Sequence, residues 1–138
     1  MMILKEVDKP KKKLCSEAML WKTFSEYIRR RDANENGICK CFTCGLIRPW
    51  QQMDAGHGIP RQHKATKYNE KNNHPQCKRC NGFEGGMREE YKKKVDKIYG
   101  AGTWDKLLLQ SKMTSKVGSF ERGIMNEFYK AEIKKLKS

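Results

Sequence analysis

The sequence predicts an α+β fold, mainly α, in which a hairpin, a loop and a helix form a zinc-stapled core between N-terminal and C-terminal helices. Three observations support this prediction. Two Cys-x-x-Cys pairs flank the segment 45–76. Apolar residues recur at helical spacing near both ends of the chain. Only 37% of the residues are apolar and 33% are charged, so a bound metal would support a small hydrophobic core.

The chain begins with a lysine-rich stretch and a first helix. Residues 1–14 are basic and contain Pro10, which predicts a flexible basic arm. Ser16 is a suitable N-cap, and apolar side chains follow it at helical spacing as far as the basic run 29–31. These apolar residues are Leu20, Trp21, Phe24, Tyr27 and Ile28. We therefore expect an amphipathic helix that starts after Ser16 and ends at the basic run.

The middle of the chain predicts a hairpin and a loop. Residues 32–37 (DANENG) have the composition of a turn. Between residues 46 and 60 (LIRPWQQMDAGHGIP), two short strands are expected to reverse near Arg48-Pro49-Trp50, so that the second strand carries His57. The polar segment 61–76 has no periodicity and is predicted to be a loop.

Three helices are predicted after the second cysteine pair. The first begins at Asn81, continues through Tyr91, Val95 and Ile98, and ends at Gly100. The second covers residues 103–111 and the third runs from Phe120 to the C-terminus. The expected apolar face of the last helix comprises Ile124, Phe128, Ala131, Ile133 and Leu136. Because a chain of 138 residues has the size of one domain, residues 15–138 are expected to fold as a single unit.

Cysteine spacing predicts a structural zinc site. The expected ligands are Cys41, Cys44, Cys77 and Cys80, in two Cys-x-x-Cys pairs that suit one tetrahedral Zn²⁺. In a reducing compartment disulfides are disfavoured, which favours metal binding by paired cysteines. Cys39 is an alternative to Cys41, although the pair with Cys41 is tighter, and Cys15 is expected to be a small apolar residue. Since four thiolates leave no open coordination position, this zinc would organise the fold and leave the chemistry to another site.

The charge of the chain indicates a polyanionic partner. The net charge is +14, and the basic residues are spread along the whole length. Such a field attracts nucleic acid above all, although a surface tuned only for solubility is the simpler alternative. No apolar run is long enough to span a bilayer and the N-terminus lacks the form of a secretory signal, so we expect a cytoplasmic protein without a membrane partner.

Acid–base and metal-binding side chains are concentrated between the cysteine pairs and just after them. Hydrolysis of a phosphodiester requires a base that takes a proton from water and a cation that neutralises the phosphate and the departing oxygen. The candidates are Asp54, His57, Arg61, His63, Asn72, His74, Asn81 and Glu84. The segment therefore contains the residue types needed for metal-dependent phosphodiester cleavage.

The same segment resembles a known family. The strings 54–57 (DAGH), 60–61 (PR) and 72–81 (NNHPQCKRCN) resemble the NinG (Rap) recombination proteins of lambda-like phages, over about residues 15–135. The stretch 80–87 (CNGFEGGM) is similar to the phage Holliday-junction resolvase endonuclease VII. Both belong with the HNH, or ββα-metal, nucleases. The resemblance implies an HNH-like hairpin-loop-helix core.

Roles for individual residues follow from this resemblance. His57 would be the general base, Asn72 would hold the loop against the catalytic strand, and Asn81 would ligate a catalytic Mg²⁺ or Mn²⁺. A histidine suits the base because its ordinary pKa is near working pH. Arg61 would suit a phosphate contact. His63 and His74 are expected to be surface or loop-tethering histidines.

The acidic ligand of the catalytic cation is left open between two residues. In many HNH enzymes an acid directly precedes the base, where this chain has Gly56. Asp54 stands at an odd offset from His57, so a bulge would be needed to bring both to one site. Glu84 is the alternative, since it shares a helix face with Asn81 at i+3.

The main functional expectation is a metal-dependent DNA endonuclease of recombination that acts on branched DNA such as Holliday junctions, in the cytoplasm of a bacterial host. The competing expectation is a non-catalytic, zinc-stabilised DNA-binding accessory module, and an RNA-directed nuclease is a third alternative. Resolution of a junction needs two cuts, which predicts a homodimer through the C-terminal helices. Recombination proteins would be further partners.

Overall fold

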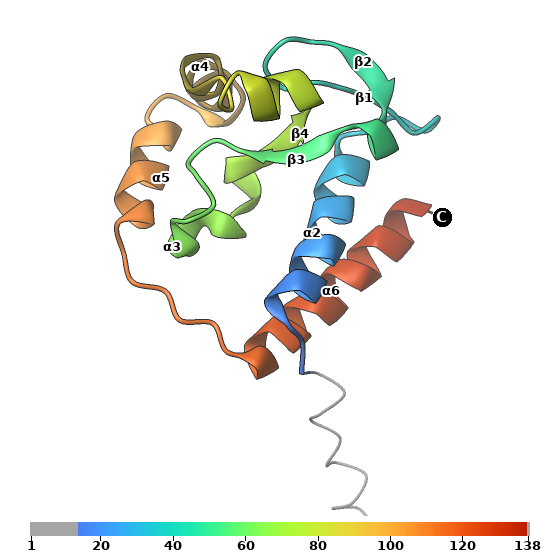
Figure 1. Ribbon diagram of the computed structural model, residues 1–138, viewed down its shortest axis with the longest axis vertical. Coiled ribbons are helices and arrows are strands. Elements are labelled where there is room, and N and C mark those ends of the chain that lie inside the picture. Colours follow the sequence, from blue (N-terminus) through green and yellow to red (C-terminus); the bar gives the residue numbers. More distant parts are fainter. Residues whose placement is uncertain (1–13, 138) are drawn as a thin grey trace, which may run out of the picture. The chain divides into compact units, whose positions relative to one another are not determined.

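The computed structural model describes residues 14–137 and shows a mixed, mainly helical fold (Figure 1). Its helices are α2 (Glu17–Arg31), α3 (Lys64–Lys67), α4 (Arg88–Tyr99), α5 (Thr103–Ser111) and α6 (Ser119–Lys137). Its strands are β1 (Ile38–Lys40), β2 (Ile47–Pro49), β3 (Asp54–His57) and β4 (Asn73–Gln76). The α+β class with a helical majority is thus confirmed. The expected basic arm lies outside the described residues, apart from Leu14.

The chain divides into two compact units. One consists of the described residues up to Tyr27 and from Lys116 onward, and the other of Ile28–Ser115. The candidate site residues all belong to the second unit. The expectation of a single domain over residues 15–138 stays a prediction.

The first unit pairs most of α2 with α6. As predicted, Ser16 caps α2, because its hydroxyl accepts a hydrogen bond from the Met19 amide at 3.1 Å. The Arg122 guanidinium donates to the Cys15 carbonyl at 2.9 Å, and the Cys15 amide donates to the Ser119 carbonyl at 3.1 Å. The two helices therefore begin side by side.

The apolar face predicted for α6 is wrong. Ile124, Phe128 and Leu136 are about half exposed, and only Ile133 of the predicted apolar face is buried. The buried residues of α6 are Gly123, Asn126, Tyr129 and Ile133. The helix buries this face because the Tyr129 ring packs edge-on against the Phe24 ring of α2, with 4.9 Å between their centroids. The small and polar residues Gly123 and Asn126 are buried on the same face as Tyr129. A prediction from the spacing of apolar residues does not detect a buried face of this composition.

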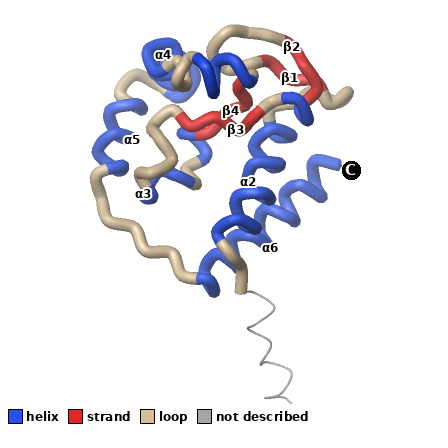
Figure 2. The backbone as a smooth tube through the Cα atoms, viewed as in Figure 1, coloured by secondary structure: helices blue, strands red, loops and turns tan. Residues whose placement is uncertain are grey.

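The second unit contains two small antiparallel sheets, drawn as red segments in Figure 2. Strand β1 pairs with β2, and β3 pairs with β4. The predicted hairpin over 46–60 is therefore wrong in its pairing, although both of its strands exist. The short helical turn Trp50–Gln52 separates β2 from β3, so each strand pairs with a segment outside 46–60.

The segment 61–76 is ordered into short elements and is not the predicted loop. It contains α3, a 3-10 turn at Glu70–Asn72 and all of β4. Each of these elements is too short to produce a detectable hydrophobic period. The polar residues 72–74 and 76 are buried, at 0–2% exposure. The spacing of apolar residues therefore does not indicate β4 as a buried strand.

The helix predicted from Asn81 to Gly100 is broken. A π-helix covers Arg79–Phe83, and α4 starts only at Arg88. Between them Gly85, Gly86 and Met87 have positive φ angles of 63°, 92° and 54°, which no α-helix tolerates. The predicted end at Gly100 is confirmed, where φ is 113°.

One of the hydrophobic clusters of the second unit lies around α4 and α5. Its buried side chains are Phe42, Ile59, Tyr91, Val95, Trp104 and Leu107. They come from the segment between Cys41 and Cys44, from the segment after β3 and from both helices. These elements therefore hold β3 and β4 in place. Among the helices that the structure describes, none is long and apolar enough to cross a membrane.

Candidate metal centre and catalytic site

Four thiols gather at one point of the second unit. The sulfur atoms of Cys41, Cys44, Cys77 and Cys80 all lie within 4.8 Å of one another, and only Cys44 is exposed. Cys39 is buried in β1 and is not part of this group, so Cys41 takes the place for which both were candidates. Four sulfur donors in this arrangement suit a tetrahedral Zn²⁺.

The protonation of the thiols depends on burial and on their neighbours. Burial raises the pKa of Cys80 to about 12. Burial acts in the same direction on Cys41, but backbone hydrogen bonds at Cys77 and Cys44 outweigh it and lower the pKa of Cys41 to about 6. A Zn²⁺ ion bound by the four sulfur atoms would deprotonate all of them.

Asn72 fastens the segment that follows β3. Its carboxamide oxygen accepts a hydrogen bond from the Ile59 amide at 2.7 Å, and its nitrogen donates to the carbonyls of Ile59 at 3.0 Å and Thr66 at 3.2 Å. The side chain is fully buried. Asn72 therefore holds both ends of the segment 59–66 to the start of β4.

His57 ends β3 with a buried imidazole. Its Nε2 lies 3.0 Å from the Lys67 carbonyl. Because a carbonyl only accepts, Nε2 carries the proton and Nδ1 keeps a lone pair. Burial lowers the pKa of His57 to about 4; the Lys67 carbonyl opposes this effect, while the charge of Arg61 reinforces it. The ring is therefore neutral at working pH, and Arg61 itself is exposed.

Asn73 supports the same carbonyl and was missed by sequence reasoning. Its side-chain nitrogen donates to the Lys67 carbonyl at 3.0 Å and to the Asn69 carbonyl at 2.8 Å. The Asn73 side-chain oxygen is buried without a hydrogen-bond partner among the described residues. The only signal in the sequence is the doublet Asn72-Asn73, which does not say which of the two amides contacts the Lys67 carbonyl.

A second polar cluster lies at the other end of β3. The Asn81 side-chain nitrogen donates to a carboxylate oxygen of Asp54 at 3.0 Å, and the Lys78 ammonium forms an ion pair with the other oxygen. Glu84 instead contacts Arg79, with 3.5 Å between the charged atoms. The structure thus brings Asn81 together with Asp54.

His57 and Asp54 belong to an unbroken ladder. Asp54 pairs with Gln76 and His57 with Asn73, with every intermediate position paired in register. Strand β3 therefore has no bulge, and residues three apart point to opposite faces of the sheet. The structure joins Asp54 to Asn81 but does not bring His57 to the same face.

Position 56, directly before His57, accepts only a glycine. A Cβ atom at position 56 would overlap the buried carboxamide of Gln76. That carboxamide donates to the Gly86 carbonyl at 3.0 Å and to the Thr43 hydroxyl at 3.1 Å. Position 56 has no room for a carboxylate, so any acidic ligand must come from elsewhere.

His74 tethers β4 to helix α4. Its ring stacks on Phe42 with 3.9 Å between centroids, and its nitrogens lie 2.9 Å from the Tyr91 hydroxyl and 2.8 Å from the Tyr99 hydroxyl. The Tyr91 hydroxyl donates to the Gly56 carbonyl at 2.8 Å. Tyr91 must then accept from His74, and Tyr99 must donate to it. Of the two roles expected for His74, the structure thus gives it the tethering one.

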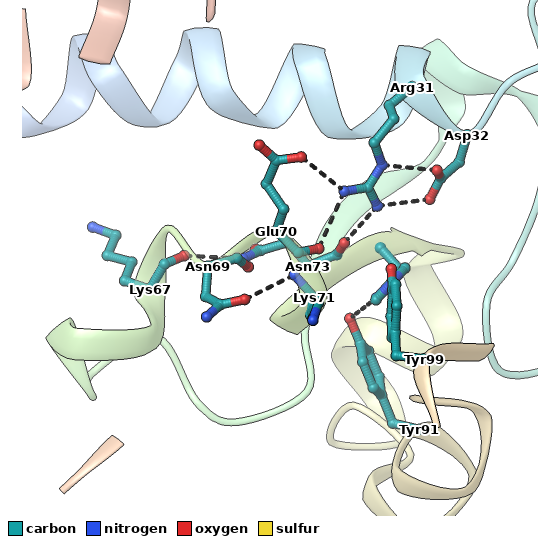
Figure 3. A network of polar contacts seen from close by, with 10 residues as sticks. Arg31, Asp32, Lys67, Asn69, Glu70, Lys71, Asn73, Tyr91 and Tyr99 are labelled. Atoms are coloured by element: carbon teal, nitrogen blue, oxygen red, sulfur yellow. Dashed lines mark hydrogen bonds and ion pairs between the residues drawn. The ribbon is translucent and has the colours of Figure 1, made fainter. Parts of the chain in front are cut away.

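Arg31 ties the end of α2 to the strand that follows Asn72, as Figure 3 shows. Its guanidinium contacts the Asp32 carboxylate at 2.8 and 2.9 Å. The same group donates to the carbonyls of Glu70 at 3.1 Å and Asn73 at 2.9 Å. The sequence shows Arg31 only as the last residue of a basic run.

Comparison with known proteins identifies one family. A family model described as Bacteriophage Lambda NinG protein matches residues 3–138. No curated protein and no solved structure matches the chain. The match covers the cysteine cluster, both ends of β3 and both units.

Proposed function

The chain belongs to the bacteriophage lambda NinG protein family, and we propose that it is a metal-dependent DNA endonuclease of recombination with an HNH-like ββα-metal core. The observation that carries the proposal is the buried, neutral imidazole of His57, which the Lys67 carbonyl orients. Neutral imidazole is the form that accepts a proton. The carbonyl also fixes the tautomer and the orientation of the imidazole, as a general base requires.

In the proposed reaction, His57 takes a proton from the attacking water at Nδ1. The lowered pKa keeps that nitrogen unprotonated at working pH. Asn72 keeps the carbonyl of Lys67 in range by fixing the preceding residue, Thr66. Arg61 is exposed one residue after Pro60 and would donate to a phosphate oxygen.

The cation of this reaction would bind at the other end of β3. The carboxylate oxygens of Asp54 and the carboxamide oxygen of Asn81 suit Mg²⁺ or Mn²⁺, which take one or two protein oxygens and fill the remaining positions with water. The contact between these two side chains supports the choice of Asp54 over Glu84. When bound, the cation supplies charge that stabilises the phosphate and the leaving oxygen. The Lys78 ammonium already pairs with the Asp54 carboxylate and would compete with the cation for it.

The cysteine cluster would hold Zn²⁺ and organise these elements. Cys77 directly follows β4, and Cys80 lies in the π-helix that carries Asn81. Phe42 lies between Cys41 and Cys44, and its backbone amide donates to the Pro75 carbonyl in β4 at 2.8 Å. Loss of zinc would therefore disturb both ends of the candidate site.

A second function is supported by the unbroken pairing of β3. Because His57 and Asp54 lie on opposite faces, the chain could be a zinc-stabilised DNA-binding accessory module of recombination without catalysis. The net charge of +14 suits binding to DNA in either case.

Cleavage by a His57 variant separates the two functions. In the enzyme proposal, His57→Ala abolishes Mg²⁺- or Mn²⁺-dependent cutting of a four-way junction while junction affinity changes little. His63→Ala is the matched control, since His63 is a partly exposed histidine of the same segment, and it should cut at the normal rate. Equal cutting by His57→Ala and the wild-type protein would rule out His57 as the base. Absence of cutting by the wild-type protein, with tight junction binding, would favour the accessory module.

We further propose a homodimer through α6. Phe120, Ile124 and Phe128 follow each other at i, i+4 and i+8 and are 46–54% exposed, which forms an apolar stripe of the kind found in helix pairs. Two copies would supply the two cuts that resolution of a junction needs. Sedimentation of the wild-type protein and of Ile124→Glu tests this: a dimer that becomes a monomer supports it, and a wild-type monomer contradicts it.

A further inference from the structure

Phe83 is unusually exposed for an aromatic side chain. Its exposed fraction is 92%, whereas the next most exposed large apolar residue of the described chain, Leu109, reaches 71%. Phe83 ends the π-helix Arg79–Phe83, two residues after Asn81, which contacts Asp54. π-Helical turns occur frequently at functional sites.

The backbone around Phe83 is well fixed. The Glu84 amide donates to the Arg79 carbonyl at 2.9 Å, and the Gly86 amide donates to the carbonyl of Cys80 at 2.8 Å. Cys80 belongs to the thiol cluster, so the turn that presents Phe83 is anchored at the proposed zinc site. The exposed ring is therefore held outward by an ordered segment.

The space and the charges beside Phe83 favour nucleic acid as the occupant. A Cβ atom added at Gly82 or Gly85 would meet nothing within 4 Å, so a flat ligand can approach the turn. Lys78 and Arg79 precede Phe83 in the chain with 70% and 56% of their side chains accessible, and their ion pairs with Asp54 and Glu84 leave this surface exposed to a phosphate. Cations next to an aromatic ring are the combination by which proteins bind phosphates and stack on bases.

We propose that Phe83 stacks on an unpaired or unstacked nucleobase at a branch point of DNA, and thereby gives the site a preference for branched over continuous duplex DNA. The inference rests on the proposed function, since it requires DNA at this site. In a continuous duplex both faces of each base are covered by neighbouring bases, whereas a branch point leaves a face open. An aromatic ring gains stacking energy only where such a face is available.

Equilibrium binding without added Mg²⁺ tests the proposal independently of cleavage. The zinc-loaded full chain is titrated into a four-way junction, a duplex with one unpaired 2-aminopurine, and a fully paired duplex at matched salt. Phe83→Ala should weaken binding to the first two DNAs roughly tenfold and leave duplex affinity unchanged. Phe83→Trp should retain branch binding, and the wild-type protein, unlike Phe83→Ala, should quench 2-aminopurine fluorescence. Leu109→Ala removes another exposed apolar side chain of the same unit and should change nothing.

Three outcomes would overturn the stacking proposal. One is equal affinity of Phe83→Ala and the wild-type protein for all three DNAs. Another is an equal loss on branched and fully paired DNA, which would indicate a general change of the surface. The third is loss of self-association in sedimentation with unchanged DNA affinity, which would assign Phe83 to a protein contact. A wild-type protein that binds branches through Phe83 but does not cut them would refute the nuclease proposal alone.

Discussion

At the scale of single residues, one backbone carbonyl determines the state of the candidate base. The Lys67 carbonyl accepts from both His57 and Asn73, at 3.0 Å each. His57 donates there through Nε2, which leaves the lone pair on Nδ1. Asn73 is thus a positioning residue: it fixes the carbonyl that fixes the imidazole.

Removal of the Asn73 amide tests this arrangement. Asn73→Ala should lower the free energy of unfolding by about 2 kcal/mol, because it deletes one buried and one partly buried hydrogen bond. Urea unfolding at neutral pH measures the change. Asn36→Ala, which alters an exposed asparagine, should change the free energy of unfolding little, and an equally small effect of Asn73→Ala would contradict the positioning role.

At the scale of elements, the fit between β3 and β4 depends on a glycine against a glutamine. The Gln76 side chain fills the space above Gly56 and is fully buried. This close approach favours the observed register of the two strands. It also fixes position 56 as a residue without a side chain.

A double-mutant cycle measures this fit. Gly56→Ala should destabilise the chain by about 3 kcal/mol, because the new methyl group overlaps the Gln76 carboxamide. In a Gln76→Ala background the same substitution should have a much smaller effect. Additive effects of the two substitutions on the free energy of unfolding would show that the two side chains do not compete for space.

The link between β4 and α4 predicts a pH dependence of stability. Burial lowers the pKa of His74 to about 3, with a smaller contribution from Arg31. Between pH 6.5 and about 3 the unfolded chain therefore binds a proton that the folded chain does not, so stability falls as the pH falls. The lowered pKa of His57, about 4, likewise makes stability fall as the pH falls from 6.5 to about 4.

Substitution of His74 should flatten this dependence. In His74→Gln, the plot of unfolding free energy against pH should be less steep by about 1 kcal/mol per pH unit below pH 6.5. The measurement is urea unfolding at several pH values in that range. A slope equal to that of the wild-type protein would mean that His74 titrates normally in the fold.

Local signals allowed some elements to be predicted from sequence, and long-range pairing limited the rest. Ser16 and Gly100 mark helix ends through chemistry contained in a few neighbouring residues. The partner of β3 could not be inferred in this way, since β4 is a polar strand that lies beyond α3. The sequence did not predict the break before α4, because the helical spacing of its apolar residues does not reveal the positive φ angles of Gly85 and Gly86.

At the scale of the whole molecule, the cysteine cluster is the part of the site that spacing predicts best. Two Cys-x-x-Cys pairs indicate one shared metal by their spacing alone, and the four sulfurs do lie together. The sequence left the acidic partner of Asn81 open between Asp54 and Glu84, because no local pattern relates Asn81 to Asp54, and the structure shows the contact with Asp54. The resemblance alone suggested a role for Asn72, and the structure supplies its partners.

Zinc analysis of two cysteine variants tests the cluster. The purified wild-type chain should contain one equivalent of zinc, and Cys80→Ser should lose it together with much of its thermal stability. Cys39→Ser is the matched control, since Cys39 is a buried cysteine outside the cluster, and it should keep the metal. Full zinc content in Cys80→Ser, measured by atomic absorption, would refute the assignment.

The proposed reaction requires His57 and a cation at Asp54 and Asn81 to act on a single DNA phosphate, although the side chains of His57 and Asp54 point to opposite faces of the sheet in this structure. A crystal structure of the zinc-loaded chain with Mn²⁺ and a four-way junction that carries an uncleavable phosphate shows whether one phosphate meets both groups. We predict anomalous density for Mn²⁺ at the oxygens of Asp54 and Asn81, with one phosphate that reaches both the ion and a water at His57 Nδ1. Mn²⁺ bound elsewhere, or a phosphate that meets only one of the two groups, would contradict it.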